Sequence, residues 1–447
     1  MKYEPAARRN PIRMVIFMQI KMNYGRSGMD LVLPDHVEVD IISRKPMPVH
    51  ADPRRAVADA LADPIGSVTL PEAANGCRSA CILICDITRP VPNDLILPIL
   101  INQLIDAGIR ADSITILIAT GLHRSNEGTE LEELIGGRSI PDQVRVENHF
   151  ARHDEDHRFL GYTRRGTPVK IDRRFTDADL RIVTGLIELH FMAGYSGGRK
   201  VIAPGIAHAD TITRLHSADF LEDLRAASCI LSGNPLHEEL LEIAGMIGGV
   251  LAVNTVIDDE RRLSYINFGE LIESHYTAVE FLKSYALAKV YRQYHTVVTS
   301  AAGYPLDKTY YQTVKGLVAA SGIVKPGGNL FIVSECSEGL GSGEFIESQK
   351  KLIEVGADAF LDGIRAKRHA DIDEWETEML LRSMKHRNVH LYSGGLCDAD
   401  HRLTGVNKVR SIEDAITESV GRFDDPCIAV IPEGPYVHPE LVIADDS

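Results

Sequence analysis

Apolar, strand-like runs alternate with helical patterns in the first half of the chain, and this alternation limits the folds open to it. Runs typical of buried strands at Ala80–Asp86, Ser113–Thr120 and Leu180–Gly185 are separated by helical patterns at Asn93–Ala107 and Thr129–Ile135. Strands separated by helices predict βαβ units and a parallel sheet. Such sheets bind ligands at the carboxyl ends of their strands, where the loops begin.

A second α/β pattern follows a helix that we expect from about Leu271 to Tyr294. Its expected strands are Thr296–Thr299, Asn329–Val333, Val389–Tyr392 and Pro426–Ile431, and its expected helix is Tyr310–Ala320. At 447 residues the chain is too long for one ordinary core. We therefore predict an α/β fold of two domains with mainly parallel sheets, residues 1–288 and 289–447, with the active-site cleft between them.

Charge and cysteine content narrow the class of protein. A net charge of −15 argues against a nucleic-acid partner, which would require clustered Lys and Arg. The longest apolar runs are far shorter than the ~20 residues of a membrane helix, and the first apolar run, which contains Gln19 and Lys21, predicts a strand and no secretory signal. Seven scattered cysteines suit free thiols, so we expect a cytoplasmic protein without a membrane partner.

Reactive side chains follow each of the three strands predicted in the first half. The loops are Asp86-Ile-Thr-Arg-Pro90, Gly121-Leu-His-Arg124 and the stretch that begins Glu188-Leu-His190. Because the crossover rule places these loops at one edge of the sheet, residues more than 100 positions apart can converge there.

The third loop continues as His190-Phe-Met-Ala-Gly-Tyr-Ser-Gly-Gly-Arg-Lys200. In a continuous helix His190 and Lys200 would lie ~15 Å apart along the axis, too far for one small site. Its three glycines favour a folded loop instead, in which Lys200 could reach toward His190 as a nucleophile or as a phosphate-binding ammonium. The alternative is a glycine loop with a surface lysine and a capping histidine.

Other polar pairs are weaker signals. His208 and His216 fall in a helix expected at Ala207–Phe220, where ~12 Å separates them, so at most one can bind a given metal ion. His216 is the better candidate. Gln312 and Lys315 share one helix face, and the histidines between positions 149 and 157 are interpreted as part of a solvated loop.

Taken in order, these segments resemble the lactate racemase family of nickel-pincer enzymes. The matching segments are 86–90, 120–124, 190–200 with 204–206, 215–217, and 303–307 with 311–316. Each is weak evidence by itself. The ordered set is highly specific, because ten residues separate His190 from Lys200 and sixteen separate Lys200 from His216.

The resemblance implies a cofactor, the nickel-pincer nucleotide, a pyridinium-3,5-bisthiocarboxylic acid mononucleotide that holds nickel through two sulfurs and a ring carbon. It implies that Lys200 is joined to this group through a thioamide and that His216 is the fourth nickel ligand. Nickel(II) in a square-planar field accepts sulfur and imidazole donors. Further cofactor contacts are expected from Asp86, Thr88, Gly121 and Tyr311. Enzymes of cofactor synthesis are expected partners, and protein made without them is expected in the apo form.

The resemblance also implies an isomerase that racemises or epimerises a small 2-hydroxy acid through a 2-keto acid, by proton-coupled hydride transfer. His123 and His190 match the two family bases, a role that a pKa near neutrality suits. Arg89 matches an arginine that orients the substrate. Gln312 and Lys315 match residues that reach the substrate from the second domain. The N-terminal domain would thus bind the cofactor, and the C-terminal domain would close over the substrate.

Two alternatives stay open from the sequence: a zinc-dependent hydrolase or lyase, and a non-catalytic ligand-binding homologue. The zinc enzyme has no evident use for Lys200, and a non-catalytic protein could dispense with His123 and His190. The sequence does not determine which 2-hydroxy acid is the substrate, the oligomeric state, or the roles of Trp375 and Lys308.

Overall fold

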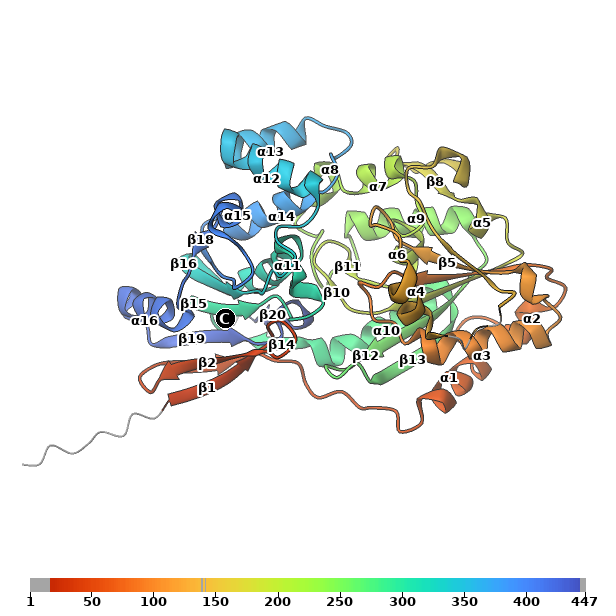
Figure 1. Cartoon of the computed structure of the whole chain (residues 1–447), viewed down its shortest axis with the longest axis horizontal. Coiled ribbons are helices and arrows are strands. Elements are labelled where there is room, and N and C mark those ends of the chain that lie inside the picture. Colours follow the sequence, from red (N-terminus) through yellow and green to blue (C-terminus); the bar gives the residue numbers. More distant parts are fainter. Residues whose placement is uncertain (1–16, 138–139, 141, 443–447) are drawn as a thin grey trace, which may run out of the picture.

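The computed structural model describes residues 17–137, 140 and 142–442, which form two α/β lobes side by side (Figure 1). The first lobe is built on a six-stranded sheet, ordered β13-β12-β9-β4-β5-β6. All neighbouring strands in it run parallel except the edge pair β12–β13. The strands are β4 (Ala80–Cys85), β5 (Ile114–Ala119), β6 (Arg145–Asn148), β9 (Leu180–Leu186), β12 (Val250–Ile257) and β13 (Leu263–Glu270).

Alternating side chains bury both faces of this sheet, as expected for a parallel sheet covered by helices. In β4, Ile82 and Ile84 pack in the core that includes residues of α1, α2 and α3, whereas Cys81 and Leu83 pack in the core that includes residues of α6 and α9. The helices of this lobe are α1 (Pro53–Ala62), α2 (Leu70–Ala74), α3 (Asn93–Asp106), α4 (Gly128–Ile135), α5 (Arg173–Thr176), α6 (Arg199–Ile202), α7 (Ala209–Leu215), α8 (Ala218–Leu221), α9 (Pro235–Ile247) and α10 (Leu271–Ala286).

The second lobe contains a six-stranded, all-parallel sheet, ordered β18-β17-β16-β15-β19-β3. Residues of α11 and α14 pack on one face, and residues of α16 and the β1–β2 hairpin pack on the other. The strands are β3 (Glu38–Ile41), β15 (Tyr294–Ser300), β16 (Val324–Val333), β17 (Asn388–Tyr392), β18 (Asn407–Lys408) and β19 (Cys427–Ile431). The hairpin strands are β1 (Phe17–Met22) and β2 (Met29–Pro34), and the helices are α11 (Tyr310–Ser321), α12 (Gly343–Val355), α13 (Ala357–Arg365), α14 (Glu374–Met384), α15 (Asp398–Leu403) and α16 (Ile412–Phe423).

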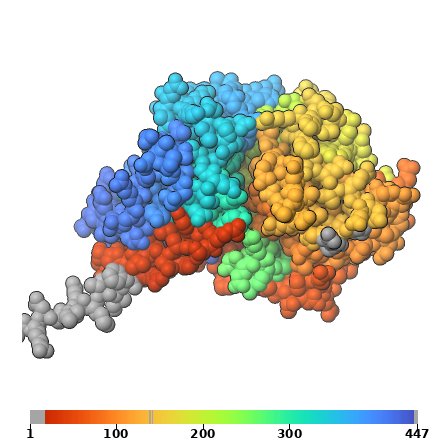
Figure 2. Space-filling model, viewed as in Figure 1, coloured from red at the N-terminus to blue at the C-terminus, as the bar shows by residue number. Residues whose placement is uncertain are grey.

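The fold class is confirmed: the architecture is α/β with mainly parallel sheets. The division of the chain after residue 288 stays a prediction, but sheet membership does not follow it, because the N-terminal strand β3 pairs with β19. The red hairpin accordingly lies against the blue lobe in Figure 1. In Figure 2 the two lobes meet along an indentation, with the cyan surface of the second facing the orange surface of the first.

Two predicted helices differ from the structure, one at its end and one in its middle. The helix expected to reach Tyr294 stops at Ala286, because β14 (Leu287–Val290) pairs with β20 (His438–Leu441), a segment distant in sequence, and this tertiary pairing overrides local propensity. The helix expected at 207–220 is divided into α7 and α8, because Ser217 takes an extended conformation at the start of α8.

Within the described ranges, no helix has the length and apolar character needed to cross a membrane. All seven cysteines lie in this part of the chain and are free thiols.

Candidate active site

Three loops at the carboxyl ends of β4, β5 and β9 meet at one edge of the first sheet, as predicted. The loop after β4 contacts the loop after β5 through Asp86 and His123, whose Oδ2 and Nδ1 atoms are 2.6 Å apart. It contacts the loop after β9 through Arg89, whose Nη1 lies 2.6 Å from Oε2 of Glu188. Side chains far apart in the sequence therefore form one polar cluster.

His123 and Asp86 form an oriented pair. Asp86 is 5 % exposed, and its Oδ1 accepts hydrogen bonds from the hydroxyl and backbone N–H of Thr88. Desolvation opposes the charged form of His123, but the adjacent Asp86 carboxylate outweighs this effect and raises the pKa of the imidazole. With Nδ1–H donated to Asp86, the neutral ring has its lone pair on Nε2, on a side chain that is half exposed. His123 thus has the geometry of a general base.

His190 is held in the opposite tautomer. Its Nδ1 accepts hydrogen bonds from the backbone N–H groups of Met192 and Ala193, both at 3.2 Å, so the neutral ring has its proton on Nε2. Burial lowers the pKa of His190 well below its ordinary value, and the nearby charges of Lys200 and Arg89 lower it further. The ring is therefore neutral at pH 7.

The segment from His190 to Lys200 is a folded loop, as its glycines predict. Leu189–His190 (β10) pairs with Gly194–Tyr195 (β11), and α6 begins at Arg199. Gly197 has a φ of +72°, and a Cβ there would lie 2.4 Å from Cδ1 of Ile187, so the tight turn requires glycine. The turn allows Lys200 to lie near His190, His216 and Lys315, as their mutual electrostatic effects indicate.

The amine of Lys200 is unusually available. Within the described ranges no hydrogen bond or ion pair involves its side chain, and the residue is partly buried. Burial lowers the pKa of the amine well below its ordinary value, and Arg89 lowers it further. A lowered pKa increases the fraction of the amine that is uncharged, and an uncharged, unpaired amine is a nucleophile.

His216 ends α7 and is not inside a helix, which corrects the prediction. Its Nδ1 lies 2.8 Å from the carbonyl oxygen of Ile212, so Nδ1–H is the donor and Nε2 has the lone pair. Burial lowers the pKa of the ring to about 4. The indole of buried Trp375 lies against this imidazole, tilted by 35° with 4.5 Å between ring centroids, and donates from Nε1 to the hydroxyl of Tyr311 at 3.1 Å. Trp375 is thus a wall of the site, and its neutral partner His216 is ready to bind a metal ion through Nε2.

The helix α11 of the second lobe contributes Lys315 and Gln312. Lys315 lines a pocket together with Arg89, His190 and Tyr436, so residues of both lobes form its walls. Burial and Arg89 lower the pKa of Lys315, while Glu376 of α14 opposes them. The Oε1 atom of Gln312 is buried and has no hydrogen-bond partner among the described residues, as expected of an atom that awaits a ligand.

The structure also places Gly121, Lys308 and the histidines between positions 149 and 157. Gly121 donates its N–H to the carbonyl oxygen of Gly205 at 2.9 Å, and so joins two loops of the site. Lys308 pairs with Glu338 at 2.6 Å. The interpretation of residues 149–157 as a solvated loop is wrong for His149 and His157, which are buried and lie with their Nε2 atoms 2.9 Å apart.

Two side chains of the site, Glu376 and Tyr436, were not among the predicted site residues. Glu188 was part of a predicted loop, but only its 2.6 Å contact with Arg89 reveals its role. Glu376 and Tyr436 reach the site from segments without a recognisable motif. A carboxylate or phenol in an ordinary polar sequence gives no signal until its partner is known.

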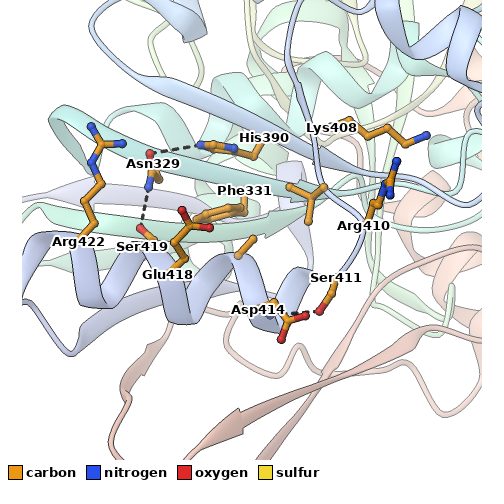
Figure 3. Close-up of a pocket in the computed structure, with 12 residues that line it drawn as sticks. Asn329, Phe331, His390, Lys408, Arg410, Ser411, Asp414, Glu418, Ser419 and Arg422 are labelled. Atoms are coloured by element: carbon orange, nitrogen blue, oxygen red, sulfur yellow. Dashed lines mark hydrogen bonds between the residues drawn. The ribbon is translucent and has the colours of Figure 1, made fainter.

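A larger hollow, of about 370 Å³, lies elsewhere, between β16, β17, β18 and α16 (Figure 3). Asn329 bridges His390 and Ser419 at its floor, and its rim mixes basic and acidic side chains, including Arg422 and Glu418. None of the predicted site residues lines it.

Among the described residues, no group of three or more His, Cys, Asp or Glu side chains is placed to hold a metal ion. A catalytic zinc site has three protein ligands. A metal ion at His216 would therefore need most of its donors from a non-protein group.

Comparison with known proteins identifies the family. The family model described as the lactate racemase N-terminal domain matches residues 24–228, and that of the lactate racemase C-terminal domain matches residues 291–438. The chain is 31 % identical to lactate racemase of Thermoanaerobacterium thermosaccharolyticum over 83 % of its own length and 87 % of the relative. It is 30 % identical to lactate racemase of Lactiplantibacillus plantarum over 85 % of its length and 89 % of the relative.

Solved structures agree with this relationship. The apoprotein of the T. thermosaccharolyticum lactate racemase superposes with a TM-score of 0.87 at 29 % identity, covering 94 % of this chain and 99 % of that one. A Thermotoga maritima protein, 16 % identical, shares the fold with a TM-score of 0.67 over 88 % of this chain and 99 % of that one. The chain belongs to the lactate racemase family and is an isomerase.

Proposed function

We propose that the chain racemises or epimerises a small 2-hydroxy acid, using a nickel-pincer nucleotide attached to Lys200. The observation that carries the proposal is the convergence of an oriented base, His123, an unpaired amine, Lys200, and a cationic side chain of the other lobe, Lys315. When bound, the nucleotide would supply the acceptor for the substrate's hydride. The substrate class follows from the two relatives, each of which is named a lactate racemase.

The residues present fit such a cofactor. Lys200 offers an unpaired amine whose pKa is lowered by burial, which favours the uncharged form that a thioamide link requires. His216 offers a free Nε2, because Nδ1 is occupied by the carbonyl of Ile212. One imidazole cannot hold nickel by itself, so the nucleotide would have to supply the remaining donors.

The chain's own residues would bind the substrate and move its proton. Lys315 and Arg89 present cations for the carboxylate of a 2-hydroxy acid, and Glu188 fixes the guanidinium of Arg89. Nε2 of His123 would take the hydroxyl proton, while Asp86 stabilises the imidazolium that forms.

His190 is proposed for the second proton-transfer role, on the other side of the substrate. Its Nε2–H first donates a hydrogen bond to a substrate oxygen, because Nδ1 is occupied by two backbone N–H groups. To accept a proton at Nε2, the ring would have to give up these two bonds. The two histidines are therefore not equivalent.

The test is the mass of Lys200 together with turnover. Protein produced with the enzymes of cofactor synthesis should contain nickel and bear an adduct on Lys200. It should also convert one enantiomer of a 2-hydroxy acid into a mixture of both enantiomers, as measured by chiral chromatography. Lys200→Ala should lack the adduct. An unmodified Lys200 under these conditions contradicts the tether.

A further inference from the structure

Tyr436 is a wall residue of the pocket between the two lobes, and its polar group is unused. It lines this pocket together with Arg89, His190 and Lys315. Its hydroxyl forms no hydrogen bond with any residue in the described part of the chain. A tyrosine hydroxyl inside a protein usually has a hydrogen-bond partner. The phenol of Tyr436 is therefore available to a ligand that enters the pocket.

The phenol is held in a fixed place. Tyr436 ends a short 3₁₀ turn, Gly434–Tyr436, which packs against α11. Gly434 has a φ of +56°, and a Cβ there would lie 2.1 Å from the carbonyl oxygen of Ser300, so the turn requires glycine. The guanidinium of Arg44 lies over the ring of Tyr436 at 5.4 Å from its centroid, within the range of a cation–π contact. Backbone and side chain thus fix the ring together.

Two cations of the same pocket also have donors without partners. Nη1 of Arg89 pairs with Oε2 of Glu188 at 2.6 Å, but Nε and Nη2 of Arg89 form no hydrogen bond within the described ranges. The ammonium of Lys315 forms no hydrogen bond or ion pair with a described residue, and it lies 6.0 Å from the centroid of the Phe191 ring. An arginine, a lysine and a tyrosine therefore present more donors than the pocket has acceptors.

The size and the charge of the pocket suit a carboxylate. Its volume of about 20 Å³ admits a group of only a few atoms. Glu188 offsets one of the two cations, Arg89 and Lys315, so the remaining positive charge matches a monoanion. The two oxygens of a carboxylate accept about four hydrogen bonds, so one carboxylate can engage all three donors.

We propose that Tyr436 donates a hydrogen bond to the carboxylate of the substrate, as a third donor beside Arg89 and Lys315, and so fixes the orientation of the 2-carbon. The inference rests on the proposed function in one respect, that the ligand of the site is a 2-hydroxy acid. A carboxylate held by two cations can still pivot about the line that joins them, and a third fixed donor removes this freedom. Burial and Glu188 raise the pKa of the phenol, so its hydroxyl keeps the proton that it donates.

The experiment measures the binding of 2-hydroxy-2-methylpropanoate to the full-length apoprotein by isothermal titration calorimetry. This acid has the carboxylate and the 2-hydroxyl group but no hydrogen at the 2-carbon, so binding is separated from turnover. The variant is Tyr436→Phe, which removes the hydroxyl and keeps the ring that contacts Arg44. The matched control is Tyr291→Phe, at a tyrosine that is 74 % exposed.

The acid should bind the wild type and the control equally, and Tyr436→Phe should bind it at least tenfold more weakly, because the lost hydrogen bond is one to a charged group. Tyr436→Phe should also unfold at the wild-type temperature. Wild-type affinity in this variant would leave the phenol as a wall only and would overturn the proposal, as would a wild type that does not bind the acid. Weaker binding that accompanies earlier unfolding would mean a structural role and would overturn it as well.

The outcome is independent of the cofactor, because the assay uses neither the nucleotide nor turnover. Failure of the proposed function is a different result, namely wild-type protein that has an unmodified Lys200 and racemises no acid after production with the enzymes of cofactor synthesis.

Discussion

The imidazole of His123 lies 2.6 Å from the carboxylate of Asp86, a residue 37 positions earlier in the chain. The pair joins the loops that follow two adjacent parallel strands, β4 and β5. The carboxylate fixes the tautomer and raises the pKa of the ring. This relationship supports the general-base role that we propose for His123.

Asp86→Asn should lower kcat by about 10²–10⁴-fold, because the ring loses its orienting partner. Since the carboxylate raises the pKa of His123, its removal lowers that pKa. The base acts only when neutral, so the acid limb of the pH–rate profile should move to lower pH. An acid limb that stays in place contradicts the pairing, and Asp106→Asn, at an exposed carboxylate, is the control.

The two histidines should differ in their tolerance of glutamine. An amide N–H can replace the hydrogen bond that Nε2–H of His190 donates, although not its proton transfer, whereas no amide can replace any part of the role of the basic Nε2 of His123. We expect His190→Gln to retain at least tenfold more of kcat than His123→Gln, measured on protein with equal Lys200 adduct. Equal losses would mean that both rings act as bases in the same way.

Glu376→Gln should alter the binding of substrate at alkaline pH. Lys315 binds a carboxylate only while protonated, and Glu376 opposes the lowering of its pKa by burial and Arg89. Without Glu376 that pKa falls further, so the alkaline limb of kcat/KM should move to lower pH. The control is Glu378→Gln, which should leave the limb unchanged. Burial raises the pKa of the Glu378 carboxyl to about 8, and its neighbour is Glu222. Movement of the limb to higher pH in Glu376→Gln is incompatible with this role.

His216→Ala should separate the two attachments of the cofactor. The adduct on Lys200 should persist by mass spectrometry, while nickel measured by plasma mass spectrometry should fall well below one per chain, because the free Nε2 is lost. His153→Ala, at an exposed histidine, should retain both. A full nickel content in His216→Ala would show that this ring is not a ligand.

The fold could be predicted where the pattern was local. The strands β4, β5 and β9 and the helices α3 and α4 follow from apolar runs and their spacing. The pairing of β3 with β19 and of β14 with β20 could not be predicted, because it depends on contacts between distant segments. Sheet order is a tertiary property.

The reactive side chains of the site could be identified from the sequence, but the protonated nitrogen of each imidazole could not. His123, His190 and Lys200 are evident as loop residues, but which nitrogen of each ring has the proton depends on Asp86 and on two backbone N–H groups. Tyr436 was the clearest omission: a tyrosine in a short turn near the end of the chain gives no signal until the pocket that it lines is known.

The most direct test of the central claim is racemisation in deuterated water. Cofactor-loaded protein is incubated with a panel of single-enantiomer 2-hydroxy acids, the products are separated by chiral chromatography, and the hydrogen at the 2-carbon is read by mass spectrometry. We expect one acid of the panel to yield its other enantiomer with the original hydrogen retained. Extensive deuterium at that carbon, or no second enantiomer from any acid of the panel, would contradict it.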